Sequence, residues 1–114
     1  MSLIYKLVAR AEWAEASALG VYAGSQVDRD DGFIHFSTAA QVRETARKHF
    51  HGVAELLLLA VDAEALGAAV TWEPSRGGDL FPHLYGPMPA SAVRRVQDIA
   101  LDGDGAPVIG ALEP

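Results

Sequence analysis

Hydrophobic and polar positions near the start of the chain follow first a strand pattern and then a helix pattern. Leu3–Ala9 places β-forming residues around a single lysine, which predicts a strand. Arg10–Leu19 is rich in Ala and Glu, and the glycine that follows it, Gly20, suits a helix end. We therefore expect a strand that leads directly into a helix.

A second helix and a buried strand are expected in the middle of the chain. Thr38 and Gln41 have the spacing of a capping box, which predicts a helix from Ala39 to about Phe50. The segment Glu55–Val61 is an apolar run with polar flanks. Such a run is typical of a central strand that is buried on both faces.

Shorter segments complete the pattern. Short β-rich stretches predict four further strands, at residues 33–36, 70–73, 80–85 and 106–109. Polar, glycine-containing stretches predict loops, at residues 24–32 and 74–79. The stretch 93–101 stays open, because its apolar spacing fits a helix and its β-branched content fits an edge strand equally well.

These elements predict a single α+β domain over residues 1–114. The expected helices lie near the N-terminal half, and strands dominate later. Because strands and helices do not alternate regularly, a mixed or antiparallel sheet is favoured over a doubly wound parallel sheet. A chain of 114 residues can bury one core and is too short for two domains.

Composition and charge exclude several classes of function. The chain has no cysteine, which rules out disulfides and thiolate metal sites. Its formal net charge is −6 and its basic residues are scattered, so a nucleic-acid partner is not expected. No apolar run is long enough for a membrane span or a signal peptide, and the expected location is the cytoplasm.

The first candidate for chemistry is the segment around His35. Alternate residues of a strand share a face, so Phe33, His35 and Ser37 point one way. Ile34 and Phe36 point the other way, and this purely apolar face belongs to the core. The first face combines an aromatic ring, an imidazole and a hydroxyl, which is typical of the wall of a cleft.

A second segment repeats this pattern around His83. Phe81, His83 and Tyr85 share one face by the same rule, while Pro82 favours an edge strand or a bulge because it has no N–H. If the two segments lie side by side, two imidazoles and two hydroxyls converge, and imidazole exchanges protons near neutral pH. The alternative interpretation, in which each histidine is a structural residue bonded within the core, stays open.

A third candidate is the loop that follows Trp72. The guanidinium of Arg76 suits a carboxylate or a phosphate, the two adjacent glycines allow close backbone approach, and Trp72 offers a stacking surface. Together they predict an anion-binding lip, and a plain solvent loop is the alternative. His49 and His51 do not face the same way on a helix, so no metal site is expected.

Several of these segments together resemble a known family. The similarity to the bacterial domain-of-unknown-function family nine-five-two extends over most of the chain and is carried by Ile4–Lys6, Trp13, Asp31–Thr38, Gln41-Val42 and Phe81–Pro87. The resemblance implies a fold similar to that of the ADP-ribosyltransferases, an α+β arrangement with a split mixed sheet around a cleft. It therefore favours a strand over residues 93–101, and it makes NAD a candidate ligand.

The resemblance also bears on individual residues. Lys6 lies on the first strand, where the transferases have a basic residue, although not the expected Arg or His. Ser37-Thr38, at the end of a strand, resembles the start of their Ser-Thr-Ser-type motif. Their late catalytic glutamate is not recognisable, because His83 and Tyr85 occupy that stretch. The usual ADP-ribosyl transfer is therefore not expected, while NAD binding or a different group transfer is compatible with the sequence.

Two functional hypotheses follow. In the first, the domain holds an NAD-like or other phosphorylated small molecule and acts as a binding protein or group-transfer enzyme, with His35 and His83 as candidate catalytic groups. The expected ligand contacts are Lys6, Phe33, Ser37, Thr38, Trp72, Arg76, Phe81 and Tyr85. In the second, the domain is a non-enzymatic interaction module whose aromatic strand faces meet a protein partner or a second copy. The oligomeric state stays open.

Overall fold

The computed structural model describes residues 2–112, apart from the side chain of Arg76. Within this range it has four α-helices and eight strands, which form three small antiparallel sheets. The predicted α+β class is confirmed. Of the two kinds of sheet that were expected, mixed and antiparallel, the described strands form the antiparallel kind.

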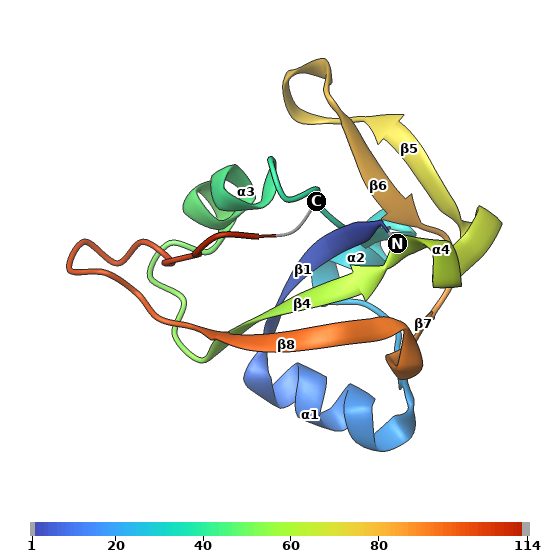
Figure 1. Cartoon of the computed structure of the whole chain (residues 1–114), viewed down its shortest axis with the longest axis horizontal. Helices are drawn as coiled ribbons and strands as arrows, with labels where there is room; N and C mark the ends of the chain where they lie inside the picture. The colour runs from blue at the N-terminus through green and yellow to red at the C-terminus, as the bar shows by residue number, and fades with distance from the viewer. Residues whose placement is uncertain (1, 113–114) are drawn as a thin grey trace.

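The central sheet has the strand order β1-β4-β8 (Figure 1). It joins β1 (Leu3–Ala9), β4 (Leu56–Asp62) and β8 (Val93–Ile99). All seven residues of β4 are buried, which confirms the expected central strand. Most of the open segment 93–101 is a strand, because β8 completes the pairing of β4 on the side away from β1.

A second sheet carries the two histidines, in the order β3-β6-β5. In it β3 (Ile34–His35) and β5 (Val70–Pro74) flank β6 (Leu80–Leu84). A backbone bridge between Tyr5 and Ser37 links this sheet to the free edge of β1. The second sheet is thereby held next to the first, and the space beside β1 lies between them.

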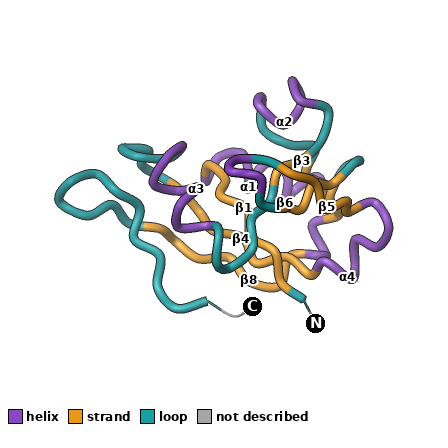
Figure 2. The backbone as a smooth tube through the Cα atoms, turned by 90° about the horizontal axis from the view of Figure 1, so that it is seen from above, coloured by secondary structure: helices purple, strands orange, loops and turns teal. Residues whose placement is uncertain are grey.

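Helices cover both faces of the central sheet. On one face, α1 (Arg10–Leu19) packs together with a small sheet of β2 (Val21–Tyr22) and β7 (Met88–Pro89). On the other face packs α3 (Val42–His49). Figure 2 shows α3 and α4 (Ala63–Leu66) at opposite sides of a centre made of strands. Both β1 and α1 have the bounds that the sequence predicts.

The segment 24–32, expected as a loop, contains the short helix α2 (Gln26–Asp31). Ser25 caps its start, because the Asp28 N–H donates to Ser25 Oγ at 3.2 Å and the Ser25 N–H donates to Asp28 Oδ2 at 2.9 Å. Gly32 ends it in the left-handed conformation, with φ 87°. A reciprocal cap at one end and a glycine at the other outweigh the polar, turn-prone composition.

Pro82 lies in the middle strand of its sheet, and the pairing of β6 has no register shift, so both predicted positions, an edge strand and a bulge, are wrong. Its carbonyl accepts a hydrogen bond from the Phe36 N–H at 3.0 Å. In an antiparallel pair the N–H of a residue points the same way as its C=O, so the missing donor of Pro82 faces the same neighbour. Because β3 ends at His35, the missing bond falls beyond the paired residues of that strand, and the proline is tolerated.

The capping contacts predicted before α3 are present. The Gln41 N–H donates to Thr38 Oγ1 at 3.2 Å, and the Thr38 N–H donates to Gln41 Oε1 at 3.0 Å. Regular helix nevertheless begins at Val42 and not at Ala39, because the residues between the two capping groups form a turn.

Outside these elements the described chain is irregular. The strand expected at 106–109 is wrong, since only one isolated bridge, between Leu101 and Pro107, forms there. No helix of the described residues is long and apolar enough to cross a membrane. The remaining described elements are short 3₁₀ turns, at Gly67–Ala69, Arg76–Gly78 and Ala90–Ala92.

Candidate functional site

A cleft of about 660 Å³ opens beside the free edge of β1. Its walls come from β1, α2, α3 and the histidine-bearing face of β6. Five of the residues that the sequence indicates as a site line it: Lys6, His35, Ser37, Phe81 and His83. Its volume lies within the range of small-molecule sites, about 300–1,000 Å³.

The two histidines face each other across the pairing of β3 with β6. His35 and His83 are direct register partners, and their ring centroids are 5.6 Å apart. Phe33 stacks on His83 with centroids 4.1 Å apart, and Tyr85 lies 5.3 Å from Phe33. The predicted shared face is therefore confirmed, and the strand pairing that the sequence left open brings both imidazoles together.

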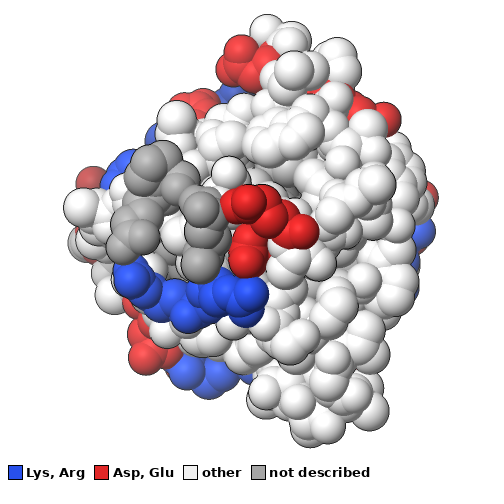
Figure 3. Space-filling view, turned by 45° about the vertical axis from the view of Figure 1, so that its right-hand side comes forward, with Lys and Arg blue, Asp and Glu red and all other residues white. Residues whose placement is uncertain are grey.

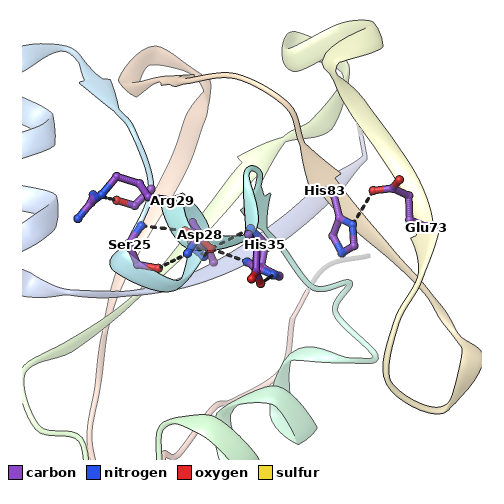
Figure 4. A network of polar contacts seen from close by, with 9 residues as sticks. Ser25, Asp28, Arg29, His35, Glu73 and His83 are labelled. Carbon is purple, nitrogen blue, oxygen red and sulfur yellow. Dashed lines mark hydrogen bonds and ion pairs between the residues drawn. The ribbon is translucent and has the colours of Figure 1, made fainter.

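Asp28 is the centre of a buried network in the cleft wall (Figure 4). Its side chain is 2% exposed and lies 2.8 and 3.0 Å from the Lys6 ammonium. His35 Nδ1 lies 2.6 Å from Oδ1, and the His35 backbone N–H donates to the same oxygen at 3.1 Å. With the cap from Ser25, each carboxylate oxygen of Asp28 has at least two partners.

Burial and charge act in opposite directions within this network. Burial alone would raise the pKa of the Asp28 carboxyl, but the hydrogen bond from His35 and the positive charge of Lys6 outweigh it and hold that pKa well below its usual range. For Lys6, burial is the larger effect and lowers the pKa of the ammonium, with Asp28 opposing. The two residues therefore form a buried ion pair in which each partner depends on the other.

The second histidine has its own carboxylate partner, Glu73 (Figure 4). His83 Nδ1 lies 2.7 Å from Glu73 Oε1, and the Tyr85 hydroxyl donates to the same oxygen at 2.7 Å. These bonds, first from Tyr85 and then from His83, lower the pKa of Glu73. His35 is held at both ring nitrogens, because its Nε2 lies 2.9 Å from Asp31 Oδ2. Glu73 contacts Nδ1 of His83 and not Nε2, so the two histidines differ in how many of their ring nitrogens a carboxylate holds.

The two hydroxyl residues after His35 have structural partners. Ser37 Oγ lies 2.9 Å from Thr45 Oγ1 on α3. Thr38 Oγ1 accepts the capping N–H before α3, and Thr38 is not among the lining residues. Ser37 therefore contributes to the cleft wall, whereas Thr38 contributes to the start of the helix.

Residues of the β5–β6 hairpin divide between its two faces. Phe81 is 7% exposed and lines the cleft. Trp72 pairs in register with Pro82, on the face opposite His83, and is 47% exposed. The side chain of Arg76 lies outside the described part of the structure. Trp72 does not line the cleft, and the anion-binding lip stays a prediction.

The two carboxylates that hold the histidines are not singled out by the sequence reasoning. A usable signal exists for Asp28, because Ser25 and Asp28 have capping-box spacing. For Glu73 the signal is the hairpin register, which pairs Glu73 with Phe81 and so sets it diagonal to His83. Both signals require a secondary-structure assignment to be made first.

The backbone of Leu7 is another feature that the sequence reasoning does not reveal. The N–H and C=O of Tyr5 both bond to Ser37, on the side away from β4. This side recurs at every second residue of an antiparallel strand, so the N–H and C=O of Leu7 also point away from β4. Leu7 lines the cleft, and β1 thus offers a ligand a donor and an acceptor side by side.

Charged residues form no broad basic area on the face seen in Figure 3. Lys and Arg side chains lie there beside Asp and Glu side chains, and most of the face carries neither kind. Among the described residues, no group of three or more His, Asp or Glu side chains is arranged to hold a metal ion. The mixture of signs agrees with the scattered basic residues of the sequence.

Comparison with known proteins gives a family and a close structural relative. Residues 7–96 match the family described as Protein of unknown function (DUF952). The X-ray crystal structure of protein CC0527 from Caulobacter crescentus is 55% identical, with 94% of each chain covered and a TM-score of 0.91. The solution NMR structure of CC0527 is 56% identical over 94% of this chain and 92% of that chain, with a TM-score of 0.84. No curated protein matches the chain.

Proposed function

Because the chain belongs to the DUF952 family, whose function its description leaves open, we propose a function from the cleft: the protein binds a small organic molecule of nucleotide size. The observation that carries this proposal is the convergence of Lys6, His35 and His83 on one cleft of about 660 Å³. A mostly apolar wall with a few convergent polar groups is typical of ligand sites.

The proposed ligand has a flat group and a phosphate, as in an NAD-like molecule. A flat group suits the wall formed by Phe81 and the backbone edge of Leu7. A phosphate would lie at the other side of Phe81, where a smaller hollow of about 290 Å³ is lined by Lys48 and Gly77 and also by the carboxylates Glu44 and Asp79. To bind the phosphate there, Lys48 must turn from Glu44, which lies 3.5 Å from its ammonium.

The proposed chemistry, a group transfer, rests on His83 and Glu73. A histidine that donates its Nδ1–H to a carboxylate keeps a lone pair on Nε2, and Nε2 can then accept a proton from a bound substrate. Glu73 also supplies a carboxylate beside His83 and Tyr85, the stretch in which the late glutamate of the ADP-ribosyltransferases is not recognisable. The likeness to that fold supports the proposal only by analogy.

A thermal-shift screen tests the proposal. The full chain is heated with NAD, ADP-ribose, nucleotides and phosphorylated sugars, each in large excess. A ligand at ~100 times its dissociation constant stabilises the native state by ~2.7 kcal/mol, which raises the melting temperature of a small domain by on the order of 10 °C. We expect at least one of these compounds to give such a shift.

Matched histidine variants then locate the binding. His83→Gln should abolish the shift while the unliganded protein melts near the wild-type temperature. His51→Gln, which changes an exposed histidine outside the cleft, should leave the shift intact. The proposal fails if no phosphorylated compound shifts the melting temperature, or if the shift survives in His83→Gln.

A second candidate function is a protein-interaction module. The observation that favours it is the exposure of Trp72 and Leu80 on the β5–β6 hairpin, at 47% and 52%. Phe81 is buried, so the surface offered to a partner is the Trp72 side of the hairpin. Light scattering after size-exclusion chromatography tests self-association: a dimer that Trp72→Ala disrupts supports this function, and a monomer at high concentration counts against self-association.

A further inference from the structure

The hydroxyl of Tyr22 is buried in the cleft wall without a hydrogen-bond partner. Tyr22 is 3% exposed, and it lines the cleft from β2. Its Oη has no polar group of the described residues within hydrogen-bonding distance. Buried hydroxyls nearly always find a partner, because removal from water without one costs free energy. This atom is therefore a candidate for a contact that a ligand completes.

Negative charge surrounds this hydroxyl. Burial, and then the negative charges of Asp28 and Glu12, raise the pKa of Tyr22 well above its usual range. The positive charge of Arg29 acts in the opposite direction, and its effect is the smallest. The phenol is therefore neutral at physiological pH and can both accept and donate a hydrogen bond. A ligand group that meets it enters a region of negative potential.

The nearby ion pair does not remove the negative charge of the other carboxylates. The ammonium of Lys6 lies 2.8 and 3.0 Å from the two oxygens of Asp28, so the charges of these two residues largely cancel each other. Glu12 and Asp31 add further carboxylates to the cleft lining. A carboxylate or phosphate placed beside Tyr22 would meet like charges, whereas a neutral or positive N–H group would not.

We propose that Tyr22 selects the polar group of the ligand: its Oη accepts a hydrogen bond from an uncharged or positively charged N–H group, such as an amide or amidine, and anions are excluded from this end of the cleft. This inference rests on the proposed ligand-binding function and deepens it. It assigns the N–H-bearing end of the ligand to Tyr22 and leaves any phosphate to the opposite end.

Three small probes of one shape test the selection. Benzamide is neutral, benzamidine is cationic and benzoate is anionic, while all three share a flat ring with a planar polar group. Their binding to the full chain is followed by amide chemical shifts in NMR titrations. We expect benzamide and benzamidine to bind at least about tenfold more tightly than benzoate, because like charges within the cleft disfavour the anion.

Two variants assign the effect to its residues. Tyr22→Phe should weaken benzamide by about fivefold, the loss typical of one neutral hydrogen bond, and benzamidine by more, because its N–H donor carries a positive charge. The same variant should melt at or above the wild-type temperature, because it removes a hydroxyl that has no partner. Glu12→Gln, an exposed change on α1, should weaken benzamidine more than benzamide.

The outcomes separate this inference from the function on which it rests. Three outcomes would overturn the selection by Tyr22: equal binding of benzoate and benzamide, no binding of any probe, or unchanged affinities in Tyr22→Phe. If a phosphorylated compound still gives a thermal shift that depends on His83, the proposed function stands without this selection. Probe binding that follows the expected order without any shift by phosphorylated compounds would overturn the proposed ligand class and support the role of Tyr22.

Discussion

Two carboxylate–imidazole pairs lie on one strand face and differ in their surroundings. In the first, Asp28 is 2% exposed and also binds the buried Lys6. In the second, the side chain of Glu73 is 35% exposed and one of its oxygens binds His83 and Tyr85. The exposure of the imidazoles is reversed, at 34% for His35 and 6% for His83, so the first pair buries its carboxylate and the second buries its imidazole.

The contacts of the two pairs predict different roles for them. Lys6 and His35 bind Asp28 from two other parts of the chain, so these contacts tie β1, α2 and β3 together. Glu73 and His83 belong to one hairpin, and their contact does not join segments that are far apart in the sequence. We therefore expect the first pair to dominate stability and the second to dominate ligand binding.

The largest effect is expected from Asp28→Ala. The buried ammonium of Lys6 would lose its partner, and breaking a buried ion pair in this way costs ~3–5 kcal/mol in the free energy of unfolding. Urea denaturation at neutral pH measures the loss. Asp30→Ala, an exposed change on the same helix, is the control and should stay within ~0.5 kcal/mol of wild type. A loss below ~1 kcal/mol for Asp28→Ala would contradict a structural role.

Acid should weaken the first pair. The pKa of Asp28 is depressed in the folded state, so its contribution to stability is complete above the unfolded pKa of ~3.9 and is lost as pH falls towards the folded pKa. The free-energy difference between wild type and Asp28→Asn should therefore shrink as the pH of the urea titrations falls from ~5 to ~2. A difference that stays constant over this range would rule out the ionised carboxylate as its cause.

Glu73→Gln should leave the fold almost intact and change His83. The carboxylate accepts the Nδ1–H of His83, and a neutral amide accepts it less strongly. The tautomer of His83, read from the ¹⁵N shifts of its ring, should therefore move away from the Nδ1–H form. Glu15→Gln, an exposed change on α1, is the control. A melting temperature that falls as far as in Asp28→Ala would remove the contrast between the two pairs.

The smallest effect is expected from Tyr85→Phe. The hydrogen bond from Tyr85 is the largest influence that lowers the pKa of Glu73, so this pKa should rise towards its ordinary value. A ¹³C NMR titration of the Glu73 carboxyl measures the change, with wild type as the reference. An unchanged pKa would show that His83 alone orients this carboxylate.

Strong local patterns allowed part of this fold to be predicted. The bounds of β1 and α1 and the buried β4 follow from runs of residue type and a glycine stop. The polar composition of residues 24–32 predicts a loop where the short helix α2 forms, because the cap between Ser25 and Asp28 depends on a helix that this composition does not indicate. The residues around Pro82 predict an edge strand or a bulge, because they do not show that the neighbouring strand β3 ends before it would need the missing N–H.

The sequence by itself determined which residues share a strand face, because side chains alternate along any extended strand. It thereby grouped Phe33 with His35 and Phe81 with His83. Only the tertiary structure decided that these faces meet, since strand pairing joins segments far apart in the chain. The same long-range packing buried Asp28 against Lys6, 22 residues away, and left the side chain of Glu73 35% exposed, so the carboxylate partners of the two histidines lie in different environments.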